Sequence, residues 1–150
     1  MMAYLVETSI LGRLANPADA EYQAASRAIL SLHNSGESLH TAPQCLIEFR
    51  NVATRPVQAN GLGLSTLHAE TIADGFEIEF ALLEETPAIF PAWKSLVRSA
   101  GILGKQVHDG RLVAVCHVHG VSHILTFNVR HFARLASFGP RIIVIDPHSI

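Results

Sequence analysis

The feature that most constrains this fold is a series of short apolar runs separated by amphipathic helical stretches. Runs at residues 3–6, 122–126 and 141–145 have the length of strands and do not alternate between polar and apolar residues. Two weaker candidate strands lie at 38–41 and 80–84. Strands without alternation are typical of parallel sheets whose two faces are both covered by helices. We therefore predict an α/β fold with a central parallel sheet of four to five strands.

Capping residues, prolines and glycines mark the boundaries of the predicted helices. The Thr8-Ser9 pair can cap a first helix, and Asp19 can cap a second one. Pro43 suits a first helical turn, whereas Pro56 forces the residue before it out of helical geometry. The predicted helices cover residues 9–16, 20–34, 43–55, 65–79, 87–100, 109–119 and 129–136.

Length and composition indicate one domain with a core of its own. Because the chain has 150 residues, of which 49% are hydrophobic, we expect a single domain over residues 1–150. No apolar stretch reaches the roughly 20 residues needed to cross a bilayer, and residues 1–6 lack the features of a targeting segment. Cys45 and Cys116 lie in apolar helical patterns, which suits buried, reduced thiols. We therefore expect a soluble cytoplasmic protein with no membrane partner.

The formal net charge of −2 excludes one class of nucleic-acid binder. A protein that holds nucleic acid through an overall positive charge needs a strongly basic composition, which this chain lacks. A local basic rim around an acidic site stays compatible with the composition.

Four oxygen-bearing side chains fall where predicted strands end or where neighbouring helices lie. Glu7 ends the first strand, and Glu48 lies in the helix that follows the second. Asp109 begins the helix before the fourth strand, and Asn128 follows that strand. Ligand sites of open parallel sheets lie beyond the carboxyl ends of the strands. We therefore predict that these four side chains meet in one catalytic site.

This group of side chains suits a hard divalent cation. Mg²⁺ and Mn²⁺ prefer oxygen ligands, and we predict that Glu7, Glu48 and Asp109 bind one of these ions. Three neighbouring carboxylates repel one another unless a cation lies between them. A bound metal lowers the pKa of a water molecule, which can then attack a phosphodiester. The sequence therefore predicts metal-dependent phosphodiester hydrolysis.

Four segments are distinctive: AYLVETSILGRL, PQCLIEFRNVATRP, VHDGRLVAVCHVHGVSHILTFNVRHF and IIVID. Together they resemble the PIN domain, and especially the VapC-like toxin ribonucleases of bacterial toxin–antitoxin pairs. The resemblance spans the whole chain and implies a PIN-like three-layer α/β/α fold. The family's catalytic positions map to Glu7, Glu48, Asp109 and Asn128, with Thr126 and Thr8 as supporting residues.

The resemblance also implies an activity and partners. It indicates an endoribonuclease that uses Mg²⁺ or Mn²⁺, cuts single-stranded or looped RNA, and acts as the toxin of a type II pair. It implies a homodimer and a cognate antitoxin whose peptide covers the active-site groove, where an arginine could pair with the carboxylates. Two alternatives stay open: a PIN domain that binds RNA or protein without cleavage, and an RNA-processing PIN enzyme without an antitoxin.

Glu7 is the main departure from the family pattern, in which the first acid is almost always aspartate. The extra methylene of glutamate moves the carboxylate by roughly 1.5 Å, about one bond length. Because Mg²⁺ demands nearly ideal octahedral geometry, this shift is expected to weaken metal binding or to slow the reaction. Glu7 is thus an active natural variant, the mark of an attenuated enzyme, or an engineered substitution. Asn128 is a milder change that lowers the charge of the site by one.

Each predicted site residue also has a simpler explanation. Glu48 taken alone is a typical solvated residue of a helix. Asp109 and Glu7 can each serve as a capping acid, because a carboxylate is stabilised at a helix N-terminus. Asn128 suits a turn. The prediction of a shared site therefore rests on the ordered series and not on any single residue.

Other polar residues give weaker signals. Four cations are candidate RNA contacts, although a solvated surface charge is the simpler explanation for each: Arg13, Arg50, Lys105 and Arg130. The group of Cys116, His117, His119 and His123 matches no standard zinc spacing. We find no P-loop, Rossmann glycine fingerprint or nucleophile elbow.

Overall fold

The computed structural model describes all 150 residues and has a five-stranded, all-parallel sheet at its centre. The strands are β1 (Ala3–Val6), β2 (Ser38–Thr41), β3 (Ala81–Leu82), β4 (His123–Leu125) and β5 (Ile143–Ile145). Each of the five predicted strand positions therefore contains a strand, although β3, β4 and β5 are shorter than predicted. The predicted α/β class and parallel sheet are confirmed.

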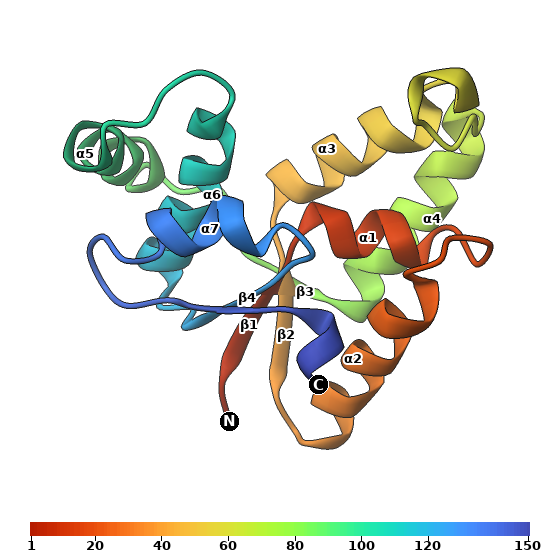
Figure 1. The fold of residues 1–150 in the computed structure, drawn as a ribbon, viewed down its shortest axis with the longest axis horizontal. Helices are drawn as coiled ribbons and strands as arrows, with labels where there is room; N and C mark the ends of the chain where they lie inside the picture. Colours follow the sequence, from red (N-terminus) through yellow and green to blue (C-terminus); the bar gives the residue numbers. More distant parts are fainter.

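Seven α-helices cover the two faces of the sheet. They are α1 (Thr8–Leu14), α2 (Tyr22–Asn34), α3 (Pro43–Thr54), α4 (Thr66–Glu79), α5 (Ile89–Ala100), α6 (Gln106–His119) and α7 (Val129–Leu135). Two 3₁₀ turns, η1 (Val57–Ala59) and η2 (Pro147–Ser149), complete the chain. Figure 1 shows α1 to α4 on one side of the sheet and α5 to α7 on the other. This arrangement is the three-layer α/β/α architecture that the resemblance implies.

Four helix starts differ from the sequence predictions. One is that of α5, which begins at Ile89 after the cap residue Ala88 and not at Pro87. The first helix is capped by Glu7, whose carboxylate accepts a hydrogen bond from the Ser9 backbone N–H, and not by Thr8-Ser9. The capping role given above as the simpler explanation of Glu7 is therefore confirmed. Glu21 precedes α2, and the side chain of Asp19 accepts from the Glu21 N–H instead of capping the helix. The sixth helix starts at Gln106, because Gly104 has a left-handed φ of 57° and opens the helical turns there.

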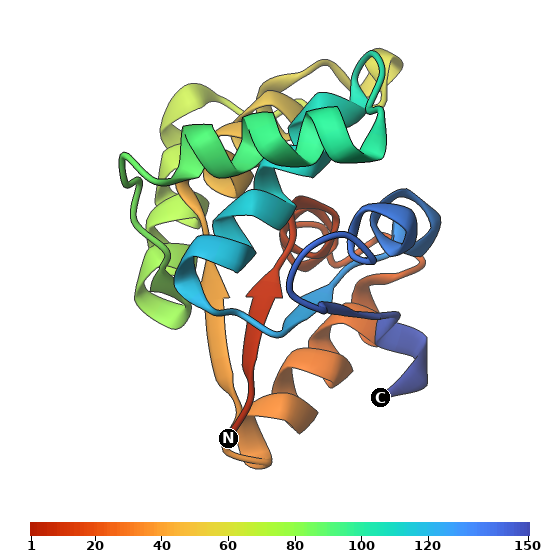
Figure 2. The same cartoon turned by 90° about the vertical axis from the view of Figure 1, so that its left-hand side faces the viewer.

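The order of the strands is β3-β2-β1-β4-β5. From β1 the chain winds outward to β2 and β3, and it then crosses back to place β4 and β5 beyond the other edge of β1. The direction therefore reverses between β1 and β4, which lie side by side with Val6 opposite Leu125 (Figure 2). In open α/β sheets the crevice beyond the carboxyl ends of such a strand pair is the usual ligand site.

The apolar core lies between the sheet and both helical layers. Phe49 of α3, Phe132 of α7 and Phe80 are fully buried, and each such side chain contributes roughly 1.5–3 kcal/mol to stability. Both cysteines are free and buried, as predicted, and burial raises the pKa of the Cys45 thiol to about 12. None of the helices has the length and apolar character needed to span a membrane.

Candidate functional site

The four predicted site residues line one cavity of about 350 Å³ beyond the carboxyl ends of β1 and β4. The topology brings them there from different parts of the chain, because β1 and β4 end at the same edge of the sheet. The cavity is lined by Glu7, Thr8, Ser9, Gly12, Arg13, Glu48, Asn51, Val52, Asp109 and Asn128. The supporting residue Thr126 lies just behind it, bonded to Glu7.

The carboxylate of Glu7 is firmly positioned even though it lies at a cavity. The residue is only 4% exposed, and its Oε2 atom accepts three hydrogen bonds. The donors are the Ser9 N–H at 3.1 Å, the Ser9 hydroxyl at 2.7 Å and the Thr126 hydroxyl at 2.7 Å. The second oxygen, Oε1, accepts no hydrogen bond from the protein. Glu7 thus caps α1 with one oxygen and keeps the other available.

Thr126 and Ser9 connect the end of β1 to the turn after β4. The Thr126 hydroxyl donates to Glu7 and accepts from the Asn128 N–H at 2.9 Å. The Ser9 hydroxyl donates to Glu7 and accepts from the Phe127 N–H at 3.0 Å. These bonds hold the turn that carries Asn128 against the first acid. Asn128 itself precedes α7, and its side chain makes no capping hydrogen bond.

Loss of the Thr126 hydroxyl is expected to destabilise the fold. In Thr126→Val the fully buried side chain keeps its shape but leaves the Asn128 N–H without an acceptor and Glu7 without one donor. We expect the free energy of unfolding, measured by urea denaturation, to fall by about 1–3 kcal/mol. The matched control is Thr71→Val, which removes an exposed hydroxyl from α4 and should change stability by less than about 0.5 kcal/mol. Equal losses in the two variants would contradict this assignment.

Glu48 enters the cavity from α3, the helix that follows β2. The hydroxyl of Thr8 donates a hydrogen bond of 3.0 Å to Glu48 Oε1, which links the start of α1 to α3. Burial raises the pKa of Glu48, and the negative charges of Glu7 and Asp109 raise it further. The hydrogen bond places Glu48, a predicted acid of the site, in direct contact with Thr8, a predicted supporting residue.

Asp109 lies in the first turn of α6 and is not the residue that caps the helix. The capping position belongs to Lys105, whose side chain makes no cap. Burial raises the pKa of Asp109, and the charge of Glu7 raises it further, whereas His131 opposes this shift. His131 Nδ1 lies 3.8 Å from Asp109 Oδ2. A protonated His131 would therefore partly neutralise this carboxylate.

The donor atoms of the cavity suit a hard cation. Its acidic side chains offer only oxygens, and Glu7 Oε1 has no protein partner. Burial first, and then the charges of neighbouring carboxylates, raise the pKa values of Glu48 and Asp109. No group of three or more His, Cys, Asp or Glu side chains has the spacing of a metal cluster.

Only one of the four candidate RNA-contacting cations lines the cavity. Arg13 does so, with its Nε 3.4 Å from Asp19 Oδ1 and its guanidinium 5.7 Å from the centre of the Phe127 ring. Arg50 is paired with Glu70 at 3.7 Å outside the cavity. The remaining two, Lys105 and Arg130, are exposed and do not line it.

Sequence reasoning missed four residues that line the cavity: Ser9, Gly12, Asn51 and Val52. Helical spacing could have found two of them, because Gly12 lies one turn after Thr8 and Asn51 one turn after Glu48. Ser9 was treated as a cap, whereas its hydroxyl in fact positions the first acid. Two of the histidines grouped by sequence bind backbone carbonyls instead, His117 that of Pro140 and His119 that of Glu84.

A three-layer α/β/α fold with this strand order is PIN-like. No protein-family model and no curated protein matches the chain. Solved structures do match it. VapBC2 from Rickettsia felis, bound to a DNA fragment from its promoter, has a TM-score of 0.68 at 15% identity and covers 97% of this chain and 98% of that chain.

Two other structures show the same likeness. VapC20 from Mycobacterium tuberculosis, a toxin that cleaves the sarcin-ricin loop, has a TM-score of 0.62 at 21% identity and covers 87% of this chain and 93% of that chain. VapBC-1 from nontypeable Haemophilus influenzae has a TM-score of 0.67 at 14% identity, with coverages of 97% and 98%. The fold of this chain is thus that of a VapC-like PIN domain.

Proposed function

We propose that this protein is a Mg²⁺-dependent endoribonuclease and the toxin of a type II toxin–antitoxin pair. The observation that carries this proposal is the single cavity into which Glu7, Glu48 and Asp109 bring three carboxylates at the reversal point of the sheet. Support comes from the VapC20 neighbour, which is a toxin that cleaves the sarcin-ricin loop, and from the VapBC structures with the same fold. With both cysteines free, we propose a cytoplasmic location.

The residues of the cavity have different proposed roles. Glu7, Glu48 and Asp109 would hold Mg²⁺ or Mn²⁺. When bound, the ion supplies an activated water and neutralises charge on the phosphoryl oxygens. Thr8 and Thr126 orient two of the carboxylates by donating hydrogen bonds to them. Arg13 and Asn128 line the same cavity and can contact the RNA backbone from its rim.

The direct test is cleavage of RNA by the purified protein. We expect a structured RNA with single-stranded loops to be cut in the presence of Mg²⁺ and to stay intact in EDTA. Adding Mg²⁺ back after EDTA should restore cleavage, which separates metal dependence from damage to the protein. Cleavage that continues unchanged in EDTA would contradict the proposed mechanism.

The raised pKa values of Glu48 and Asp109 predict how pH changes the effect of a metal. Between the ordinary carboxyl pKa of about 4 and the raised values, the folded protein binds more protons than the unfolded chain. The stabilisation that Glu48 and Asp109 contribute is fully present below the ordinary carboxyl pKa, and it is lost as the pH rises through their raised pKa values. A cation offsets this loss only where the carboxylates are ionised.

We therefore expect Mn²⁺ to raise the Tm more at about pH 7 than at about pH 5. The Tm is measured by thermal unfolding with Mn²⁺ and with EDTA at each pH. The difference between the two Tm values at one pH cancels the contribution of other titrating groups. A metal-induced shift in Tm of the same size at both pH values would speak against ligation by these carboxylates.

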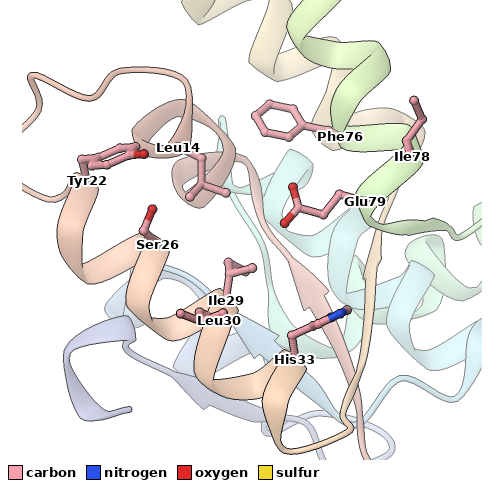
Figure 3. A pocket seen from close by; sticks show the side chains of 9 residues that line it. All are labelled: Leu14, Tyr22, Ser26, Ile29, Leu30, His33, Phe76, Ile78 and Glu79. Carbon is pink, nitrogen blue, oxygen red and sulfur yellow. The ribbon is translucent and has the colours of Figure 1, made fainter.

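An antitoxin partner is supported by a second, apolar groove. This groove of about 560 Å³ lies between α1, α2 and α4, and Figure 3 shows Leu14, Ile29 and Phe76 facing it from the three helices. Leu30 and Ile78 line it and are largely exposed. An amphipathic helix of an antitoxin could bury these side chains while an arginine of the same partner pairs with the carboxylates. We also propose that the toxin is a homodimer.

The competing function is a PIN-type module that binds RNA or protein without cutting it. The observation that favours it is Glu7, whose Oε2 is fully engaged in capping α1 and in bonding Thr126. A protein that binds RNA but leaves it intact at every Mg²⁺ or Mn²⁺ concentration would support this function over cleavage.

A further inference from the structure

A second surface, outside the carboxylate cavity, combines an exposed Phe90 ring and a half-buried Trp93 ring with cations. We call it the aromatic patch and define it by Phe90, Trp93 and Lys94 of α5 and by His108 and Arg111 of α6. A hollow of about 330 Å³ lies within it, lined by Phe90, Trp93, Val107, His108 and Arg111. Figure 2 shows α5 crossing the front of the molecule, with one side open to solvent. The hollow lies within the roughly 300–1,000 Å³ of small ligand sites.

A hydrogen bond holds the Trp93 ring in place without any ligand. The indole N–H of Trp93 donates a hydrogen bond of 2.8 Å to the Val107 carbonyl. The ring centres of Phe90 and Trp93 are 5.6 Å apart, with their planes tilted by 44°. Phe90 is 61% exposed, so the apolar core does not account for its position. The patch therefore presents an exposed Phe90 ring beside a fixed, half-buried Trp93 ring.

Helix α5 supplies positive charge beside these rings, whereas Arg111 of α6 forms an ion pair with Glu85 at 2.6 Å. Helix α5 carries Lys94 and Arg98 and contains no acidic residue. Lys94 Nζ lies 5.7 Å from the centre of the Phe90 ring, and Arg98 shares a hollow with both residues. Single-stranded nucleic acids are bound by this combination, because bases stack on aromatic rings while cations pair with phosphates. A symmetric contact between two copies of the chain through this patch would bring Lys94 and Arg98 of one copy close to the same cations of the other, and like charges repel.

The aromatic patch adjoins the carboxylate cavity through Gln44. The side-chain amide of Gln44 donates to the His108 carbonyl at 2.8 Å and accepts from Arg111 Nη1 at 3.1 Å. Gln44 lies on α3 one helical turn, about 5.4 Å, before Glu48. His108 directly precedes Asp109 on α6. An RNA strand in the cavity can therefore continue onto the patch.

We propose that the aromatic patch binds an unpaired nucleobase of the RNA substrate, one or two nucleotides from the cleaved bond. The base stacks on Phe90 and Trp93, and Lys94 and Arg98 pair with the adjoining phosphates. This inference rests on the proposed ribonuclease function and adds a subsite that selects single-stranded RNA. A duplex cannot use the subsite, because its bases are stacked and paired internally.

The test measures binding separately from cleavage. In an Asp109→Asn background, a short single-stranded RNA is titrated while the fluorescence of Trp93, the only tryptophan of the chain, is followed. We expect the RNA to quench this fluorescence and an abasic strand of equal length not to do so. Phe90→Ala should weaken RNA binding about 5- to 100-fold, and Phe90→Tyr should largely restore it. The matched control Leu67→Ala, which truncates a residue of α4 that is 73% exposed, should bind RNA like the parent.

Each contrary result has a distinct meaning. If Phe90→Ala binds RNA as tightly as the parent, or the abasic strand quenches equally, the nucleobase subsite is wrong even where wild-type cleavage is intact. If Phe90→Ala changes the oligomeric state but not the RNA affinity, the patch is a contact between copies and the inference is overturned. If the wild type neither binds nor cuts RNA, the proposed function fails together with the subsite.

Discussion

Replacing Asp109 with asparagine is expected to abolish RNA cleavage and, at the same time, to stabilise the metal-free protein. The carboxylate of Asp109 faces the same cavity as Glu7 and Glu48, and its raised pKa shows that its charged form is disfavoured there. Asparagine has nearly the same shape but no charge, so it removes repulsion together with a metal ligand. We expect cleavage to fall at least about 100-fold, since residues that only support ligands already cost roughly 10–100-fold.

Stability should move in the opposite direction. At neutral pH the free energy of unfolding of Asp109→Asn in EDTA is expected to rise by up to about 1 kcal/mol, and the increase in Tm with Mn²⁺ should largely disappear. The matched control is Asp74→Asn, which changes an exposed carboxylate of α4 and should leave cleavage and the metal effect intact. Loss of both cleavage and stability in Asp109→Asn would instead indicate a structural role.

Replacing Glu7 with glutamine is expected to remove activity while preserving the fold. The amide oxygen of glutamine can take the place of Oε2 and accept the hydrogen bonds from Ser9 and Thr126. The NH₂ group then occupies the position of Oε1, where it cannot bind a cation. We expect cleavage to fall at least about 100-fold, with the free energy of unfolding within about 1 kcal/mol of the wild type.

Two further substitutions at the same position define what the glutamate does. Glu7→Ala leaves one buried and two part-buried donors without this acceptor and removes the cap of α1, so it should destabilise the protein by about 2–4 kcal/mol. Glu7→Asp shortens the side chain and is expected to raise the cleavage rate at a given Mg²⁺ concentration, because aspartate is the first acid of the family pattern that the sequence resembles. A slower Glu7→Asp variant would show that the site is built around the longer side chain.

Local patterns predicted the elements of this fold well. The run at residues 3–6, the proline at position 43 and the capping serine at position 65 each mark an element that the structure contains. The predictions were wrong where two local features favoured different starts for the same helix. Asp109 is a good capping residue, yet the turn at Gly104 starts the helix earlier and places Asp109 inside its first turn.

The candidate site was also predicted in outline, because acids at the carboxyl ends of parallel strands must share one edge of the sheet. The residues that position these acids were not all predicted. Ser9 is an example, because its hydroxyl accepts a hydrogen bond from the Phe127 N–H, a neighbour far away in the chain that local spacing does not reveal. The aromatic patch was missed for the same reason, because α5 and α6 place Trp93 beside His108 only after they have packed together.

The sequence by itself determined which segments form helices and which form strands, through the spacing of their apolar residues. It also determined that the sheet is parallel and that acids lie at its edge, because both follow from local spacing and burial. Only the tertiary structure decided the strand order β3-β2-β1-β4-β5, which places the reversal between β1 and β4. Strand pairing depends on contacts between segments distant in the chain, and short apolar runs do not specify their partners. That pairing is what sets Thr126 against Glu7 and makes four scattered positions into one cavity.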